Sequence, residues 1–327
     1  MYTPLGEAAL NTGQRLECGV VLGPDAEWRD RILALLNHKG PEWAKQIRRS
    51  LEGPLDHLET RFYIGCTGGR IITHLMIAGA RGAGILGHVY TIPEERRKGA
   101  CTALMARQMA HTLQVGYRVL VLGTGFESPP YWIYHSFGFR SIAPGRGEMK
   151  WLAEPDAEAH LFRSAPVRVR DLRWDDWPWV DLLGRQPPTP DEELPRSPLL
   201  GLKEYGSLEG LFCFFQMRRG DSPEIQARAL TTESGSTVGW AILGPDARWY
   251  HDVLLLDLYI HPHFTAHAGA LLDCLEWPTE KPVVAYTTGR AGWKSAALAG
   301  VGFQPATQLE GWLRFADGRR NLVIWRR

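Results

Sequence analysis

Apolar positions in the first half of the chain recur with helical spacing in some stretches and form short runs in others. Apolar residues three or four positions apart predict helices at residues 27–36 and 100–113. Runs rich in β-branched and aromatic residues predict strands at residues 61–66, 70–78, 84–92, 117–122 and 148–152. Gly68 and Gly69 predict a tight hairpin turn, since glycine readily adopts positive φ. Ser128, followed by two prolines, predicts the start of another helix over residues 131–136.

The same order of elements starts again after a polar segment at residues 154–160, which we interpret as a linker. The later pattern predicts helices at residues 174–183, 268–275 and 293–299. It predicts strands at residues 224–232, 238–243, 253–260, 282–286 and 321–325. A repeated element order indicates a tandem repeat of one α+β fold with a mixed α/β sheet. We therefore expect two domains, at residues 1–155 and 165–327.

Composition and charge narrow the classes of protein. The chain has 327 residues, with 37 Lys plus Arg against 36 Asp plus Glu, so the net charge is +1. This balance lacks the basic field of a nucleic-acid-binding protein, and no partner of that kind is expected. We see neither the roughly 18 uncharged apolar residues of a membrane span nor a signal pattern at the N-terminus. We expect a cytoplasmic protein with no membrane partner.

Cysteine usage agrees with that compartment. The five cysteines are an odd number, are widely scattered and include no CxxC pair; they are Cys18, Cys66, Cys101, Cys213 and Cys274. This pattern favours neither a disulfide framework nor a cysteine-based zinc site. We expect free thiols and no metal.

The candidate chemistry lies in residues 89–102, which read as a strand, a basic turn and a helix start. N–H groups at a helix N-terminus carry partial positive charge and bind anions, and a glycine lets a phosphate approach the backbone closely. The pattern predicts a phosphate or pyrophosphate site; a solvated charged turn is the alternative. The expected binding residues are Tyr90, Thr91, Arg96, Arg97, Lys98, Gly99, Ala100, Cys101 and Thr102.

Two motifs together resemble the GNAT acetyltransferase superfamily, over roughly residues 16–152. Arg96, Gly99 and Cys101 fill the places of its Arg/Gln-x-x-Gly-x-Gly/Ala motif. The family's late Tyr-x-x-x-Gly-Phe element is matched by Tyr134, Gly138 and Phe139. The chain departs from the family at Cys101, which replaces Gly or Ala. It departs again at Glu127, where the family often has Asn.

This resemblance implies an acetyl-CoA-dependent N-acetyltransferase in which an amine attacks the thioester directly. A backbone N–H near Thr91 would stabilise the oxyanion, and Tyr134 would act as general acid. The acceptor would be a small-molecule or peptide amine. We assign no general base, because His74 and His88 on predicted strands are typical structural histidines. The sequence indicates no oligomeric state.

The second half resembles a degenerate copy of the first. Thr265 replaces the arginine that begins the phosphate motif, Ala268 replaces its glycine, and Leu298 replaces the tyrosine. The resemblance therefore implies that residues 165–327 have a structural or acceptor-shaping role.

Two alternatives stay open. One is a non-catalytic protein that binds CoA or acyl-CoA and regulates another activity. The other is a metal-dependent protein built on His261, His263 and His267, whose spacing on a strand and turn is compatible with transition-metal ligands.

Overall fold

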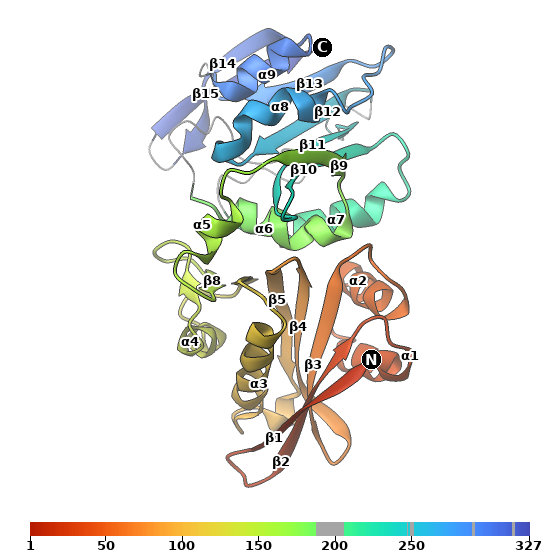
Figure 1. Cartoon of the computed structure of the whole chain (residues 1–327), viewed down its shortest axis with the longest axis vertical. Helices are drawn as coiled ribbons and strands as arrows, with labels where there is room; N and C mark the ends of the chain where they lie inside the picture. Colours follow the sequence, from red (N-terminus) through yellow and green to blue (C-terminus); the bar gives the residue numbers. More distant parts are fainter. Residues whose placement is uncertain (188–205, 247, 249–251, 290–291, 316–317) are drawn as a thin grey trace. The chain divides into compact units, whose positions relative to one another are not determined.

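The computed structural model describes residues 1–187, 206–246, 248, 252–289, 292–315 and 318–327. The chain forms two compact units, each of mixed α and β structure around its own mixed sheet (Figure 1). Unit 1 comprises Met1–His160 with Trp174–Pro178, and unit 2 comprises Leu161–Arg173 with Trp179–Arg327. Among the described residues, no helix is both long and apolar enough to cross a membrane.

Unit 1 contains an eight-stranded sheet in the order β1-β2-β3-β4-β5-β6-β8-β7. Each of the first five strands pairs antiparallel with the next, β6 runs parallel to β5, and β8 returns antiparallel to β6. The strands are β1 (Tyr2–Ala9), β2 (Arg15–Leu22), β3 (Glu59–Thr67), β4 (Arg70–Ala80), β5 (Ala83–Thr91), β6 (Val119–Gly123), β7 (Arg140–Ser141) and β8 (Glu148–Leu152).

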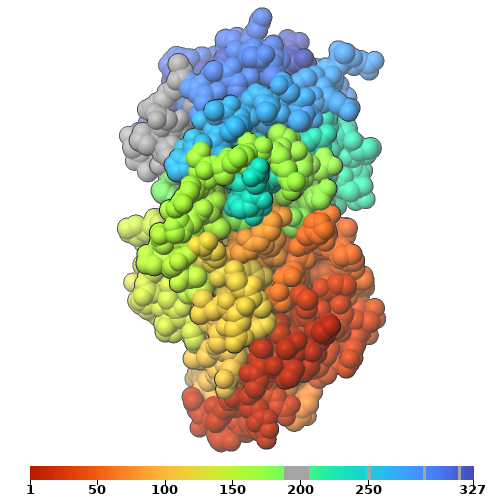
Figure 2. All heavy atoms as spheres, in the orientation of Figure 1, coloured from red at the N-terminus to blue at the C-terminus, as the bar shows by residue number. Residues whose placement is uncertain are grey.

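Helices cover both faces of this sheet, with α1 and α2 on one face and α3 on the other (Figure 1). The helices are α1 (Ala26–Leu35), α2 (Pro41–Glu52), the 3-10 helix η1 (Pro93–Glu95), α3 (Ala100–Gln114) and α4 (Pro129–Ser136). Leu104 and Met105 of α3 are fully buried against Leu75 and Ile77 of β4 in the main apolar core. β1, red in Figure 2, lies at the surface.

The segment Trp174–Pro178 belongs to unit 1, although the residues on either side of it belong to unit 2. It contains η2 (Trp174–Asp176), whose two aspartates are buried and form ion pairs with Arg81. The carboxylate of Asp56 accepts a hydrogen bond of 2.7 Å from the backbone N–H of Trp174. Polar contacts therefore fix the segment within the first unit.

Unit 2 has a seven-stranded sheet in the order β14-β15-β13-β12-β11-β10-β9. Without β1, the sheet of unit 1 has the order β2-β3-β4-β5-β6-β8-β7. Read from its other edge, the sheet of unit 2 has the order β9-β10-β11-β12-β13-β15-β14, which is the same succession. The parallel pair is β5 with β6 in one unit and β12 with β13 in the other. The strands are β9 (Val167–Asp171), β10 (Gln226–Thr232), β11 (Thr237–Pro245), β12 (Leu254–Ile260), β13 (Val283–Thr287), β14 (Gln304–Phe315) and β15 (Gly318–Arg326).

The helices described in the second half range from five to eleven residues. They are α5 (Ala157–Leu161), α6 (Trp177–Gly184), α7 (Glu209–Arg219), η4 (Pro262–His267), α8 (Ala268–Leu272) and α9 (Trp293–Gly300). The sequence predicts a linker at residues 154–160, and the structure has α5 over most of this segment, ending one residue beyond it at Leu161. Ala157 is completely buried there, so one apolar anchor is enough to order a short helix in a polar stretch.

Candidate functional site

The site begins at β5, which stays paired with β6 only at its start. The parallel register joins Ala83, Gly84 and Ile85 to β6, whereas β5 continues to Thr91. On its other side β5 remains paired with β4, with a register shift between His74 and Met76. Residues 86–91 therefore extend beyond their β6 register, and their backbone groups on that side are available to a ligand.

An irregular turn leads from β5 into α3. Arg97 and Gly99 both have left-handed backbone conformations, with φ of 64° and 88°. Glycine adopts this region without steric cost, which explains its place at the N-cap of the helix. No side chain caps α3 there, so the first N–H groups, from Ala100 onward, point out of the helix unsatisfied by it. Such a helix start attracts an anion.

Two of the three predicted cations lie at this turn and line the cavity described next. The Arg96 side chain donates from Nε to the carbonyl oxygen of Thr91 at 3.0 Å, and its guanidinium lies 5.8 Å from the centre of the Tyr90 ring. Lys98 instead donates from Nζ to Glu95 at 3.1 Å and is not a lining residue. Within the described residues, no carboxylate forms an ion pair with Arg96 or Arg97, so these two arginines supply the positive charge at the cavity.

One cavity of about 400 Å³ brings the strand end, the turn and α4 together. Every predicted binding residue except Lys98 lines this cavity, and so does Tyr134. Glu127, with φ of 55°, is not among the lining residues. The lining consists of Val89, Tyr90, Thr91, Glu95, Arg96, Arg97, Gly99, Ala100, Cys101, Thr102, Pro129, Pro130, Ile133 and Tyr134.

Tyr134 reaches the cavity from α4 and is only 6% exposed. Ser128 caps this helix by accepting a hydrogen bond from the N–H of Tyr131 at 3.4 Å, which sets where the helix begins. Burial raises the pKa of the Tyr134 phenol, and the neighbouring Cys101 raises it further. Burial also raises the pKa of Cys101 to about 11. Both groups are therefore protonated at neutral pH.

Sequence reasoning overlooked Glu95, Val89 and Ile133 as lining residues. Glu95 had a local signal, since it stands three residues before Lys98 and can form an ion pair across one turn. Ile133 directly precedes Tyr134 on α4, and both line the cavity; the sequence alone did not indicate that the isoleucine would do so. The two prolines were recognised as a helix start, without their role as part of the wall.

The corresponding region of unit 2 has different contacts. Residues 262–267 form η4, followed by α8 of five residues, and Leu298 of α9 is completely buried. His263 donates a hydrogen bond from Nδ1 to the carbonyl oxygen of Phe162 at 3.0 Å. His261 Nδ1 accepts a hydrogen bond from the backbone N–H of His263 at 3.3 Å. The Nδ1 atoms of two of these histidines thus already have protein partners.

Among the described residues, the side chains close enough together to bind one metal ion are not the three histidines of the second half. Glu154, Asp156 and His160 offer ligand atoms within 4.8 Å of one another, all exposed. The three histidines of the second half, His261, His263 and His267, do not form such a group in the part of the chain that is described.

Comparison with known proteins gives matches only at the level of structure. No protein-family model matches the chain. No curated protein matches its sequence. Among solved structures, a GNAT phosphinothricin acetyltransferase from Sinorhizobium meliloti, in complex with AcCoA, is 14% identical. It covers 49% of this chain and 87% of its own, with a TM-score of 0.40.

Two further solved structures match to a similar extent. A GNAT-family acetyltransferase from Streptococcus pneumoniae is 14% identical over 50% of this chain and 99% of its own, with a TM-score of 0.40. The ribosomal-protein-S18-alanine N-acetyltransferase from Escherichia coli is 17% identical over 49% of this chain and 92% of its own, with a TM-score of 0.35. Each match spans about half of the present chain.

Proposed function

We propose that this chain is an acetyl-CoA-dependent N-acetyltransferase of the GNAT type, with its chemistry in residues 1–155 and a small-molecule or peptide amine as acceptor. One observation carries the proposal. A single cavity joins an uncapped helix N-terminus, two arginines and a buried tyrosine at the free end of a strand. These are the groups that a long thioester with a pyrophosphate requires.

The pyrophosphate end of acetyl-CoA would bind at the start of α3. The left-handed Gly99 has no Cβ, so an anion can approach the N–H groups that follow it. Arg96 and Arg97 supply positive charge beside them. Cys101 adds a side chain to the lining but keeps its N–H, so it narrows this end of the cavity without removing a donor.

Acetyl-CoA supplies an acetyl thioester as the group to be transferred. The strand end would bind the pantetheine arm through the backbone of residues 86–91. A backbone N–H near Thr91 would stabilise the negative charge that develops on the carbonyl oxygen when the amine attacks. As the C–N bond forms and the C–S bond breaks, Tyr134 would donate its proton to the departing sulfur, and the attacking nitrogen would release one proton to water, from which the phenolate regains its own. The phenol is protonated at neutral pH and so holds the proton to be donated, while burial raises its pKa and makes it a weaker acid.

We propose further that the chain is a tandem duplication and that residues 165–327 shape or support the site without chemistry of their own. The matching strand succession of the two sheets supports this. So does the sequence of the second copy, where Ala268 and Leu298 stand at the glycine and tyrosine positions.

A non-catalytic acyl-CoA-binding protein is the second candidate, and Cys101 favours it. This thiol lies in the first turn of α3, at a position where the family has Gly or Ala, and it lines the cavity. A binding protein would keep the anion site and have no need of the Tyr134 proton.

The deciding experiment measures thiol release from acetyl-CoA, coupled to DTNB, across a library of amines. Tyr134→Phe removes only the hydroxyl and should lower kcat about 10²- to 10⁴-fold while acetyl-CoA affinity stays unchanged. Tyr131→Phe is the matched control, because Tyr131 lies on the same helix but is not a lining residue.

The outcomes separate the candidates. Acetyl-CoA at 100 times its Kd should stabilise the protein by about 2.7 kcal/mol. Stabilisation without turnover of any amine supports the binding protein. An unchanged melting temperature contradicts both candidates.

A further inference from the structure

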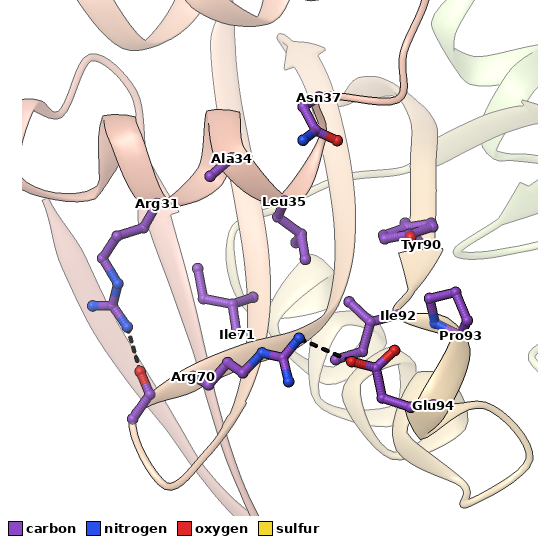
Figure 3. Close-up of a pocket in the computed structure, with 11 residues that line it drawn as sticks. Arg31, Ala34, Leu35, Asn37, Arg70, Ile71, Tyr90, Ile92, Pro93 and Glu94 are labelled. Atoms are coloured by element: carbon purple, nitrogen blue, oxygen red, sulfur yellow. Dashed lines mark hydrogen bonds and ion pairs between the residues drawn. The ribbon is translucent and has the colours of Figure 1, made fainter.

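A second cavity, of about 470 Å³, lies in unit 1 and shares one residue with the first (Figure 3). Tyr90 lines both cavities, so both border the end of β5. Leu35 of α1, Ile71 of β4 and Ile92 give the second cavity an apolar interior. This volume lies in the range of sites for small organic molecules.

Two arginines give this cavity its charge. Arg31 donates from Nη2 to the carbonyl oxygen of Gly69 at 2.7 Å, and its guanidinium lies 4.1 Å from the centre of the Trp28 ring. Within the described part of the chain, no carboxylate forms an ion pair with it. Arg70 pairs with Glu94 at 2.9 Å. Two guanidiniums against one carboxylate leave a net positive charge at the cavity, and their free donors suit a carboxylate ligand.

The order of residues along α1 gives the cavity a direction. The ring of His38, beyond the end of α1, lies 4.1 Å from the ring of Tyr90. Leu35 precedes it, and Arg31 stands one further helical turn back, about 6 Å along the axis. Figure 3 agrees, with Leu35 and Ile71 between Arg31 and Tyr90. A ligand in this cavity therefore meets a cation at one end, an apolar middle, and Tyr90 at the other end.

We propose that the acceptor is a primary amine joined through an apolar chain to a carboxylate, with its carboxylate at Arg31 and its amine at Tyr90. This rests on the proposed function, because Tyr90 also lines the cavity proposed for acetyl-CoA. The apolar interior binds the carbon chain, and Arg31 selects for the charge at its end. An amine of the same length that ends in a methyl group or in a second amine lacks that contact.

Three probes of equal length test the assignment on the full-length protein: 6-aminohexanoate, hexylamine and 1,6-diaminohexane. Binding is measured by calorimetry in the presence of CoA, and turnover by thiol release. We expect 6-aminohexanoate to bind most tightly and to have the highest kcat/KM. The shorter 3-aminopropanoate should be a poorer substrate, because it cannot span from Arg31 to Tyr90. Equal or better binding of hexylamine or of the diamine overturns the assignment.

Arg31→Gln localises the effect. Loss of a charge-assisted hydrogen bond should raise the KM for 6-aminohexanoate about 10- to 100-fold and change the KM for hexylamine much less. Arg48→Gln is the matched control, since Arg48 is an exposed arginine on α2 that pairs with Glu52 and does not line the cavity. An equal change for both amines, or no change, contradicts the role of Arg31.

Failure of the assignment and failure of the proposed function give different results. Selective binding of 6-aminohexanoate without turnover of any amine contradicts the transferase and keeps the ligand class. Turnover in which hexylamine is preferred keeps the transferase and overturns the ligand class. If the three probes are neither bound nor turned over, the ligand class is overturned. The wider amine library then tests separately whether the chain is a transferase.

Discussion

The Nδ1 atom of His74 donates a hydrogen bond of 3.0 Å to the carbonyl oxygen of His88, across β4 and β5. His88 has φ of 50°, in the left-handed region that most residues avoid. The bond lies beside the register shift of the two strands and fixes the point where β5 becomes irregular. The last residues of the strand start from this point; Val89, Tyr90 and Thr91 line the first cavity, and Tyr90 lines the second as well.

Acid should weaken the fold through His74. Complete burial lowers its pKa to about 4, below the value of about 6.5 for an unfolded chain. Because the unfolded chain binds a proton at this histidine more readily, the free energy of unfolding is unaffected by protonation of His74 above about pH 6.5. It falls by about 3 kcal/mol as the pH decreases from about 6.5 toward 4. Urea unfolding at a series of pH values measures it. His74→Asn keeps an N–H donor but does not titrate, so its stability should fall less over this range. An equal slope for both proteins would contradict the assignment.

Gly99→Ala should impair both stability and cofactor binding. Alanine at a φ of 88° costs about 1 kcal/mol, and its Cβ would lie 3.1 Å from Oδ1 of Asn11. Relaxation of the turn would also misplace the N–H groups at the start of α3. Denaturant unfolding and acetyl-CoA titration measure the two effects. Gly40→Ala is the control at another helix N-cap, with φ of −56° and open space around it, and should change neither.

Arg81→Met should destabilise unit 1 by about 3–5 kcal/mol. The substitution removes a cation that pairs with the carboxylates of Asp175 and Asp176, which are almost completely buried. Chemical denaturation of the full chain measures the loss. Arg48→Met breaks an exposed pair with Glu52 and should cost less than about 1 kcal/mol. Similar losses in the two variants would show that the segment 174–178 contributes little to this unit.

Cys101 should react slowly with iodoacetamide. Its pKa of about 11, against 9.0 for an ordinary thiol, lowers the fraction of reactive thiolate about 100-fold at neutral pH. Mass spectrometry after timed labelling measures the rate against Cys274, which is exposed. Acetyl-CoA should slow the labelling of Cys101 further and leave Cys274 unaffected. Equal rates for the two thiols would place Cys101 in a more open environment than described here.

The sequence predicted the elements whose signals are local. α3 follows from its apolar spacing and from Gly99 and Gly116, both of which have positive φ. α2 escaped detection because its buried face includes Gln46 and Ser50, whose side chains bond each other at 2.8 Å. A count of apolar positions misses a face that is satisfied by an internal polar pair. β1 escaped because most of its residues are exposed, so it lacks an apolar alternation.

The first cavity was also largely predictable, because most of its lining comes from one strand, one turn and one helix in succession. The second cavity was not. Arg31 and Arg70 come from α1 and β4, and only the packing of the helix on the sheet brings them to one space. Nothing in either local sequence indicates the other.

The succession of strands in unit 1 has a consequence for how the chain folds. β3, β4 and β5 are joined by short turns, so their contacts require little loop-closure entropy. β6 meets β5 only after the whole of α3, and β8 only after α4 as well. Contacts of low sequence separation form fastest. The strand that carries the site is therefore expected to be in place, with its irregular end already shaped by β4, before the opposite wall of the cavity arrives.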